Sequence, residues 1–151
     1  MILQEDTRQQ KGAHNVKHEY WKSTGVPVYR SKLFVGDYCL APKKAVDTKA
    51  SMLEIAQNIG GNKAEHKRFI DELKRAQEIG CELIILIENT DGIQDIKDVE
   101  SWYNPRRDYY ENAIPGTRLA KAMRTIQERY GCTFMFCTPE EAAETIIDIL
   151  R

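Results

Sequence analysis

Residues 36–49 read GDYCLAPKKAVDTK, and this stretch carries two acidic residues and a lysine that predict a functional site. Asp37 follows one strand-like run, whereas Asp47 and Lys49 stand two apart in a second one. Side chains i and i+2 of a strand share a face, so Asp47 and Lys49 are expected to point the same way. Turn residues at 41–44 predict a hairpin between the two strands, which would bring Asp37 near Asp47. Two carboxylates and an ammonium would then converge.

These side chains have the chemistry that phosphodiester hydrolysis requires. Asp37 and Asp47 provide the hard oxygen ligands that Mg²⁺ or Mn²⁺ prefers, and the backbone carbonyl of Thr48 is a further candidate. Lys49 is suited to orient the attacking water or to stabilise the charge of the transition state. The stretch therefore predicts a metal-dependent nuclease site. On the spacing alone, the alternative is an exposed hairpin with charges on its wet face.

Glu54, just beyond this stretch, has two interpretations. It is close enough in sequence to be a further metal ligand. The residues from Ser51 to Glu54 also form a capping box, in which the Glu54 side chain closes the start of a helix. Both readings stay open at the level of sequence.

Strands alternate with helices on both sides of the stretch. Residues 82–88 read ELIILIE, a near-continuous apolar run typical of a central strand covered on both faces. Other strands are expected near the N-terminus, at 26–35 and at 132–137. Apolar residues at helical spacing, together with capping residues, predict helices at 15–23, from Ser51 to Gly60, at 63–79, at 118–130 after Thr117, and from Thr138 onward. This order predicts an α/β sandwich with a mixed sheet, antiparallel early and parallel late.

Composition describes one ordinary soluble domain that spans residues 1–151, with 30% charged residues and a net charge of −1. This charge argues against a protein that coats nucleic acid, but it allows local basic patches. The longest apolar run, Leu83–Ile87, is far too short to cross a membrane, and Met1–Gln10 does not resemble a signal peptide. A cytoplasmic location is therefore expected.

The segment 89–116 is the least regular part of the chain. It places Arg106 and Arg107 among several aromatic residues, a mixture that nucleic-acid-binding loops often have. Arg118 and Lys121 extend a basic helix face behind it. A partly packed loop and a solvated helix would have the same composition, and a dimer contact is a further alternative.

Five motifs in order resemble the nuclease domain of the XPF family, a branch of the PD-(D/E)XK nuclease superfamily. They are DTRQ at 6–9, LFVGDY at 33–38, VDTKAS at 46–51, KRF at 67–69 and IILIE at 84–88. The resemblance extends to about residue 90, and it implies the restriction-endonuclease-like sandwich, in which helices flank a mixed central sheet. It also implies cleavage of DNA with Mg²⁺ or Mn²⁺, often at branched or flapped structures.

The resemblance assigns roles to individual residues. Asp37, Asp47 and Lys49 match the catalytic positions, and Asp6 and Arg8 match supporting positions at the edge of the site. Arg68 matches a position on the helix that packs beside it.

This chain departs from the family pattern at several positions. Asp47 replaces a glutamate, Thr48 replaces an arginine and Gln9 replaces a glutamate. Leu53 stands where the family has an acid, and Glu54 is next to it. The chain contains no helix-hairpin-helix module of the kind that such nucleases use for DNA binding.

The sequence therefore predicts a metal-dependent DNA endonuclease that acts in DNA repair, recombination or phage DNA processing, with RNA as another substrate to consider. A homodimer or a partner protein would compensate for the small surface of one domain. One alternative is a nucleic-acid-binding subunit with little or no activity. The other is a Holliday-junction resolvase or a restriction-like nuclease of the same superfamily.

Overall fold

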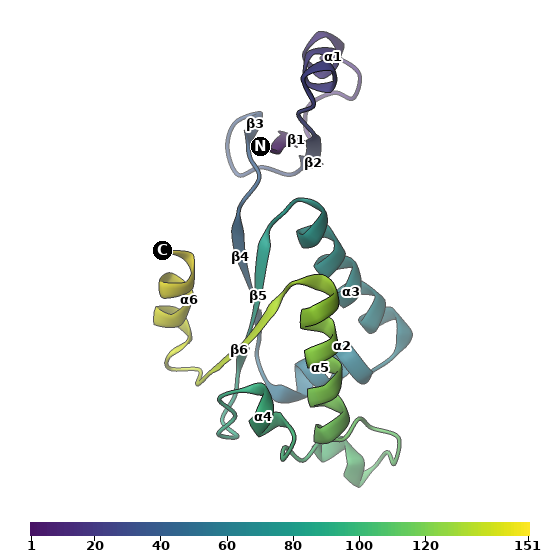
Figure 1. Ribbon diagram of the computed structural model, residues 1–151, viewed down its shortest axis with the longest axis vertical. Coiled ribbons are helices and arrows are strands. Elements are labelled where there is room, and N and C mark those ends of the chain that lie inside the picture. Colours follow the sequence, from purple (N-terminus) through teal and green to yellow (C-terminus); the bar gives the residue numbers. More distant parts are fainter. The chain divides into compact units, whose positions relative to one another are not determined.

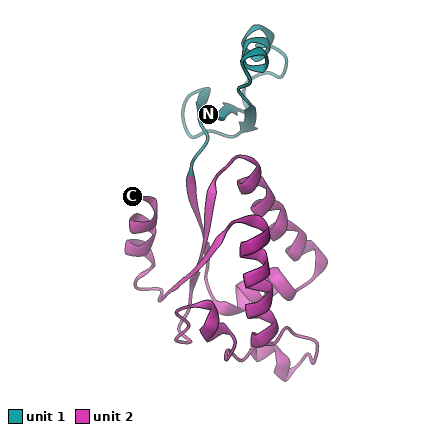
Figure 2. Cartoon of the chain, in the orientation of Figure 1, with its two compact units in different colours: residues 1–43 teal, residues 44–151 magenta.

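The computed structural model describes all 151 residues, which form two compact units, residues 1–43 and 44–151 (Figure 2). The first unit contains β1 (Leu3–Asp6), α1 (Asn15–Thr24), β2 (Val28–Ser31) and β3 (Tyr38–Leu40). Its strands form a mixed sheet in the order β2-β1-β3, in which β1 runs parallel to β2 and antiparallel to β3. Each unit is described by itself.

The first unit has a small apolar core. Leu33 is its one buried apolar side chain, and its other buried side chains, Glu5 and Asp6, are acidic. Helix α1 ends at Gly25, whose left-handed conformation (φ 73°) allows its N–H to close the last turn, as the sequence predicted. Ion pairs and backbone hydrogen bonds therefore contribute much of what organises this unit.

The second unit is built around a parallel sheet in the order β4-β5-β6. Its strands are β4 (Lys44–Lys49), β5 (Glu82–Glu88) and β6 (Thr133–Cys137). Its helices are α2 (Met52–Gly60), α3 (Lys63–Glu78), α4 (Ile96–Val99), α5 (Gly116–Tyr130) and α6 (Ala142–Leu150), with a 3₁₀ helix, η1, at Pro105–Asp108.

Strand β5 is the centre of this sheet, and both of its faces are covered. Helices α2, α3 and α5 lie on one side, where Ile85 and Ile87 belong to the main apolar core (Figure 1). Helix α6 lies on the other side, where Leu86 packs with Cys137 and Ala142. The prediction of a central, doubly covered strand at 82–88 is confirmed, because a strand in this environment needs apolar residues at consecutive positions.

The predicted hairpin at 36–49 is wrong. Strand β3 pairs with β1, and β4 pairs with β5, so the two strands of the expected hairpin belong to different sheets. The chain leaves the first unit after Lys43 and enters the parallel sheet of the second. The turn-like residues at 41–44 therefore link two units.

Two predicted helix starts are also wrong. Helix α5 begins at Gly116 with Pro115 as its N-cap, so Thr117 lies inside the helix. Helix α6 begins at Ala142, and Thr138 instead closes a turn in which its hydroxyl accepts from the N–H of Glu141 at 3.3 Å. The expected strand at 26–35 shortens to β2, while the other predicted elements are found within two residues of their expected ends.

The fold class is the predicted one, an α/β arrangement in which helices flank sheets of mixed strand direction. The antiparallel pairing occurs early in the chain and the parallel pairing late, but they are divided between two sheets. None of the helices has the length and apolar character needed to cross a membrane.

Candidate active site

Strand β4 presents Asp47 and Lys49 on one face, as their spacing predicts. In the parallel ladder, Asp47 is level with Ile85 and Lys49 with Ile87, on the side of the sheet that carries the main core. The Lys49 Nζ atom lies 2.9 Å from Asp47 Oδ2. The two charges therefore form an ion pair at the margin of an apolar core.

Lys49 is held in place on more than one side. Only 9% of the residue is exposed, and its Nζ lies 5.5 Å from the centre of the Phe69 ring on α3. The aromatic face attracts the ammonium, and the aliphatic stem packs beside the core. A cation restrained in this way is available to an anion that approaches from the open side.

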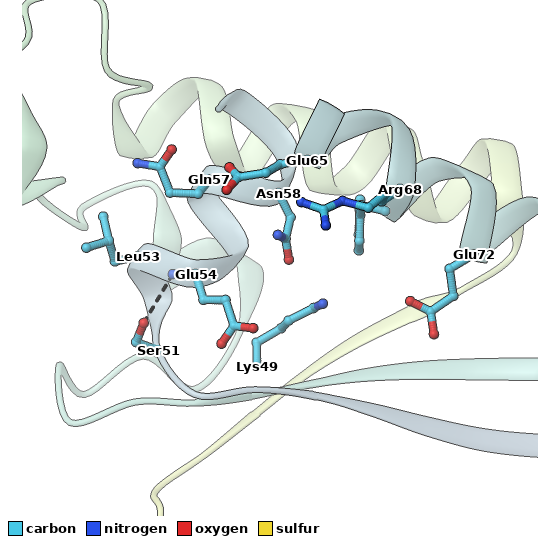
Figure 3. Close-up of a pocket in the computed structure, with 10 residues that line it drawn as sticks. Lys49, Ser51, Leu53, Glu54, Gln57, Asn58, Glu65, Arg68 and Glu72 are labelled. Atoms are coloured by element: carbon cyan, nitrogen blue, oxygen red, sulfur yellow. Dashed lines mark hydrogen bonds between the residues drawn. The ribbon is translucent and has the colours of Figure 1, made fainter. Parts of the chain in front are cut away.

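This open side is a hollow of about 540 Å³ between α2 and α3, here named the Lys49 hollow (Figure 3). Its wall includes Lys49, Glu54, Asn58, Glu65, Arg68 and Glu72. The Glu54 and Asn58 side chains of α2 point to the side on which Lys49 lies, and the Arg68 side chain of α3 extends toward Asn58 and Glu65. The hollow thus combines carboxylates, an amide and two cations.

The structure shows the capping role of Glu54. Its N–H donates to Ser51 Oγ at 3.1 Å, and its Oε2 accepts the N–H of Ala50 at 2.6 Å. The serine hydroxyl and the glutamate carboxylate thereby satisfy two backbone N–H groups at the start of α2. Glu54 also lines the Lys49 hollow. Its role as a metal ligand therefore stays a prediction.

Glu72 is a member of this site that the sequence did not reveal. It is half-buried on α3, and its burial, followed by the nearby charge of Asp47, raises the pKa of its carboxyl group above the ordinary value. Lys49 and Arg75 partly offset this rise. Helical spacing is the feature of the sequence that could have revealed Glu72. Glu65, Arg68 and Glu72 recur on the face of α3 that lines the hollow.

The oxygen atoms of this region suit a divalent cation. Asp47 Oδ2 and Asn58 Oδ1 are buried without a hydrogen bond of regular geometry, although Lys49 is the ionic partner of Asp47. Magnesium and manganese prefer such hard oxygen ligands. Within residues 44–151, no three acidic, histidine or cysteine side chains surround one point, so the donors fit a cation in kind but do not form a complete cage.

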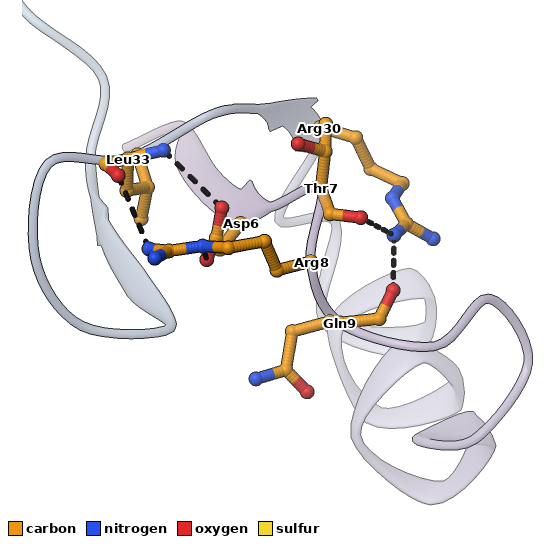
Figure 4. A network of polar contacts seen from close by, with 6 residues as sticks. All are labelled: Asp6, Thr7, Arg8, Gln9, Arg30 and Leu33. Carbon is orange, nitrogen blue, oxygen red and sulfur yellow. Dashed lines mark hydrogen bonds and ion pairs between the residues drawn. The ribbon is translucent and has the colours of Figure 1, made fainter.

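The first unit carries the other predicted acids, Asp6 and Asp37. The buried Asp6 carboxylate accepts the N–H of Leu33 at 3.3 Å and pairs with the Arg8 guanidinium, which also donates to Leu33 O at 3.2 Å (Figure 4). Burial alone would raise the pKa of Asp6, but its hydrogen bonds from Leu33 and Arg8 lower it overall. The Asp6–Arg8 pair thus anchors the end of β1.

Asp37 is next to this network through the backbone. The N–H of Asp6 donates to Asp37 O at 2.8 Å, while the Asp37 side chain is exposed. Asp37 and Asp47 belong to different units, and their predicted approach stays a prediction.

The predicted DNA-contacting residues of the second unit fall into three settings. Arg68 lines the Lys49 hollow. Arg106 stacks on the Tyr110 ring, 5.0 Å from its centre, whereas Arg107 braces the loop by donating to Ala113 O at 2.7 Å. Arg118 and Lys121 are exposed on α5 and line another hollow.

Comparisons with known proteins place this chain in a family. Residues 6–149 match the model of the ERCC4 domain. Two solved structures are similar to the chain, XPF from Aeropyrum pernix in complex with DNA (20% identity, TM-score 0.49) and XPF from Aeropyrum pernix (21% identity, TM-score 0.49). They cover 99% and 100% of this chain, which spans 63% and 64% of theirs. No curated protein matches the chain significantly. Since the family model matches nearly the whole chain, the protein belongs to the ERCC4 domain family.

Proposed function

We propose that this protein is a metal-dependent endonuclease that hydrolyses phosphodiester bonds of DNA. The observation that carries the proposal is the Asp47–Lys49 pair, which lies beside an open hollow with a second, half-buried carboxylate at Glu72. Membership of the ERCC4 domain family supports the same reaction. Branched or flapped DNA is the proposed substrate, in repair, recombination or phage DNA processing.

The proposed roles follow from the charge of each side chain. Asp37 and Asp47 are the proposed ligands of Mg²⁺ or Mn²⁺, each by its match to a catalytic position of the family pattern, and Thr48 and Glu54 are further candidate ligands. When bound, the cation would neutralise the phosphate and acidify a water. Lys49 would stabilise the charge that develops on the phosphate oxygens, because its restrained ammonium faces the hollow.

Other residues would position the substrate and the site. Asp6, which Arg8 holds at the end of β1, is proposed for the supporting role that its match to the family pattern implies. Basic side chains would contact the DNA backbone, since positive charge dominates affinity for nucleic acid. We propose this role for Arg8, Arg68, Arg106, Arg107, Arg118 and Lys121.

Two observations favour a second candidate, a DNA-binding subunit with little activity. The Glu54 carboxylate already accepts a backbone N–H, and Thr48 stands where the family pattern has an arginine. Both features leave fewer charged groups for catalysis. A partner protein would then supply the cleaving site, whereas a homodimer would only enlarge the surface that binds DNA.

Cleavage assays separate these candidates. Labelled flap, splayed, four-way and linear DNA would be incubated with Mg²⁺ or Mn²⁺ and the wild type, Lys49→Ala or Lys74→Ala. We expect Lys49→Ala to lower the cleavage rate about 100-fold or more, because it removes a charge that acts on the transition state. Lys74 is exposed on α3, and its alanine variant serves as the matched control.

Two results would contradict the proposal. Equal cleavage rates for the wild type and Lys49→Ala would exclude Lys49 from the reaction. Tight binding of branched DNA by a wild-type protein that cleaves none of the substrates would support the binding subunit instead.

A further inference from the structure

An exposed aromatic surface lies next to the Lys49 hollow, on the loop 104–114. Tyr109 is 84% exposed and Tyr110 60% exposed, and Arg106 covers part of the Tyr110 ring. Isolated exposed apolar residues are common, but neighbouring tyrosines with a stacked arginine form a larger amphipathic surface. The proposed catalytic roles do not use these two tyrosines.

The loop that carries the tyrosines is rigidly built. Asn104 is buried, with 1% exposed, and its side chain donates to Ile114 O and accepts from Arg106 N, both at 3.0 Å. The N–H of Tyr110 donates to Arg106 O at 2.8 Å. The rings are therefore presented by a braced backbone, so a ligand that stacks on them need not order the loop.

The tyrosine surface borders a hollow that adjoins the Lys49 hollow. A second hollow of about 360 Å³ is lined by Arg106, Tyr110 and Asn112 and by the turn between α2 and α3; we name it the Tyr110 hollow. Gln57 and Glu65 line both this hollow and the Lys49 hollow. The two hollows are therefore neighbours, and the Tyr110 ring lies on the far side of these two side chains from Lys49.

The path continues beyond the tyrosines into positive charge. A third hollow of about 580 Å³ shares Gly60 and Ile114 with the Tyr110 hollow, and its rim carries Arg118, Lys121 and Arg129; we name it the basic hollow. No acidic residue lines it, and these three cations form no ion pair. Unpaired cations above an apolar floor suit the phosphates of a polyanion.

We infer that the three hollows form one track for an unpaired DNA strand, whose bases stack on Tyr110 and Tyr109 and whose phosphates contact the basic hollow. A duplex conceals the faces of its bases in its own stack, so an exposed tyrosine ring can recognise only bases that are unpaired. This inference rests on the proposed function, since it places the cleaved phosphate in the Lys49 hollow. It adds which residues would hold the unpaired strand of such a substrate.

Binding measurements without metal test the track separately from cleavage. Fluorescence anisotropy in EDTA would compare a labelled oligothymidine of about 12 nucleotides, a length within the usual range of such sites, with a blunt duplex of two separate complementary strands. We expect Tyr110→Leu to weaken binding of the oligothymidine about fivefold or more, the loss of one stacked base, and to leave binding of the duplex unchanged. Tyr110→Phe keeps the aromatic face and should bind as the wild type does.

Controls separate stacking from folding and from charge. Tyr20→Leu replaces a similarly exposed tyrosine on α1, 66% exposed, and should change nothing. Arg118→Gln and Arg129→Gln should each reduce the salt dependence of oligothymidine binding, by about 0.7 in the logarithmic slope for each phosphate contact removed. Circular dichroism spectra would verify that every variant is folded.

The outcomes distinguish this inference from the proposed nuclease activity. If Tyr110→Leu binds the oligothymidine as tightly as the wild type, or weakens the duplex equally, the track is wrong even where the protein cleaves DNA. If the selective loss is observed in a protein that cleaves none of the branched substrates, the strand track stands and the nuclease proposal fails.

Discussion

Glu72 illustrates what one residue can report about the site. Its carboxyl group lies half-buried near Asp47, so two negative charges share a region from which water is partly excluded. Burial and like charge both favour the protonated form, which is why its pKa is raised. Paired acids with unequal environments are frequent in active sites, and a cation between them would relieve the repulsion.

This environment predicts a pH-dependent gain in stability for Glu72→Gln. A carboxyl group whose pKa is higher in the folded state than in the unfolded state destabilises the folded state once the pH exceeds the unfolded value. The variant should therefore equal the wild type at low pH and become more stable as the pH rises through the raised pKa. Urea unfolding from pH 4 to pH 7, followed by circular dichroism without metal, measures the difference in free energy of unfolding.

Glu78→Gln is the matched control for this measurement. Glu78 is exposed on the same helix, so the same substitution should leave the free energy of unfolding nearly unchanged at every pH. A Glu72→Gln variant that is less stable than the wild type near pH 7 would show that the Glu72 charge is favourably paired.

At the scale of elements, caps predicted some helix starts and failed at others. Ser51 and Asn62 accept the N–H groups of Glu54 and Glu65, and α2 and α3 begin where these caps predict. The cap predicted at Thr117 is wrong because α5 starts at Gly116. The Gly116 backbone packs so closely against the carbonyl groups of Val99 and Trp102 that a Cβ at this position would lie 2.4 Å from each oxygen. A contact with a distant loop thus sets this start, and no local motif encodes it.

Substitutions of the true cap Asn62 and of Thr117, which caps no helix, should differ in how much they lower the free energy of unfolding. Asn62→Ala should lower the free energy of unfolding by about 1 kcal/mol, because the N–H of Glu65 loses its partner at 2.9 Å. Thr117→Ala should change it by less than about 0.5 kcal/mol, since its side chain caps nothing. Urea unfolding measured side by side gives both values, and equal losses would contradict the assigned start of α5.

At the scale of the whole molecule, the two units differ in how much apolar surface they bury. Every buried apolar residue except Leu33 belongs to residues 44–151, where helices cover both faces of the parallel sheet. A unit of 43 residues with one buried apolar side chain has little hydrophobic stabilisation of its own.

This asymmetry predicts that residues 44–151 fold without the first unit. The fragment should show a helical circular dichroism spectrum and one cooperative urea transition, because both apolar clusters are retained. A peptide of residues 1–43 should show no cooperative transition. Loss of the transition in the larger fragment would mean that the first unit is needed to complete the core.

Local chemistry in the sequence determined several parts of the site and the fold. The spacing of Asp47 and Lys49 places them on one face, since alternation is a property of any strand. The apolar run at 82–88 identifies the central strand, and the Ser51 and Asn62 caps locate the starts of two helices. Each of these inferences needs only residues that are close in sequence.

Only the tertiary structure decided which distant segments meet. The pairing of β3 with β1 and of β4 with β5 replaced the expected hairpin, because strand partners are chosen among distant segments and turn residues suit a link as well as a hairpin. The same holds for Glu72, which approaches Asp47 from a helix 25 positions away in the sequence. Contacts of this kind depend on how whole elements pack, and no local pattern of residues specifies them.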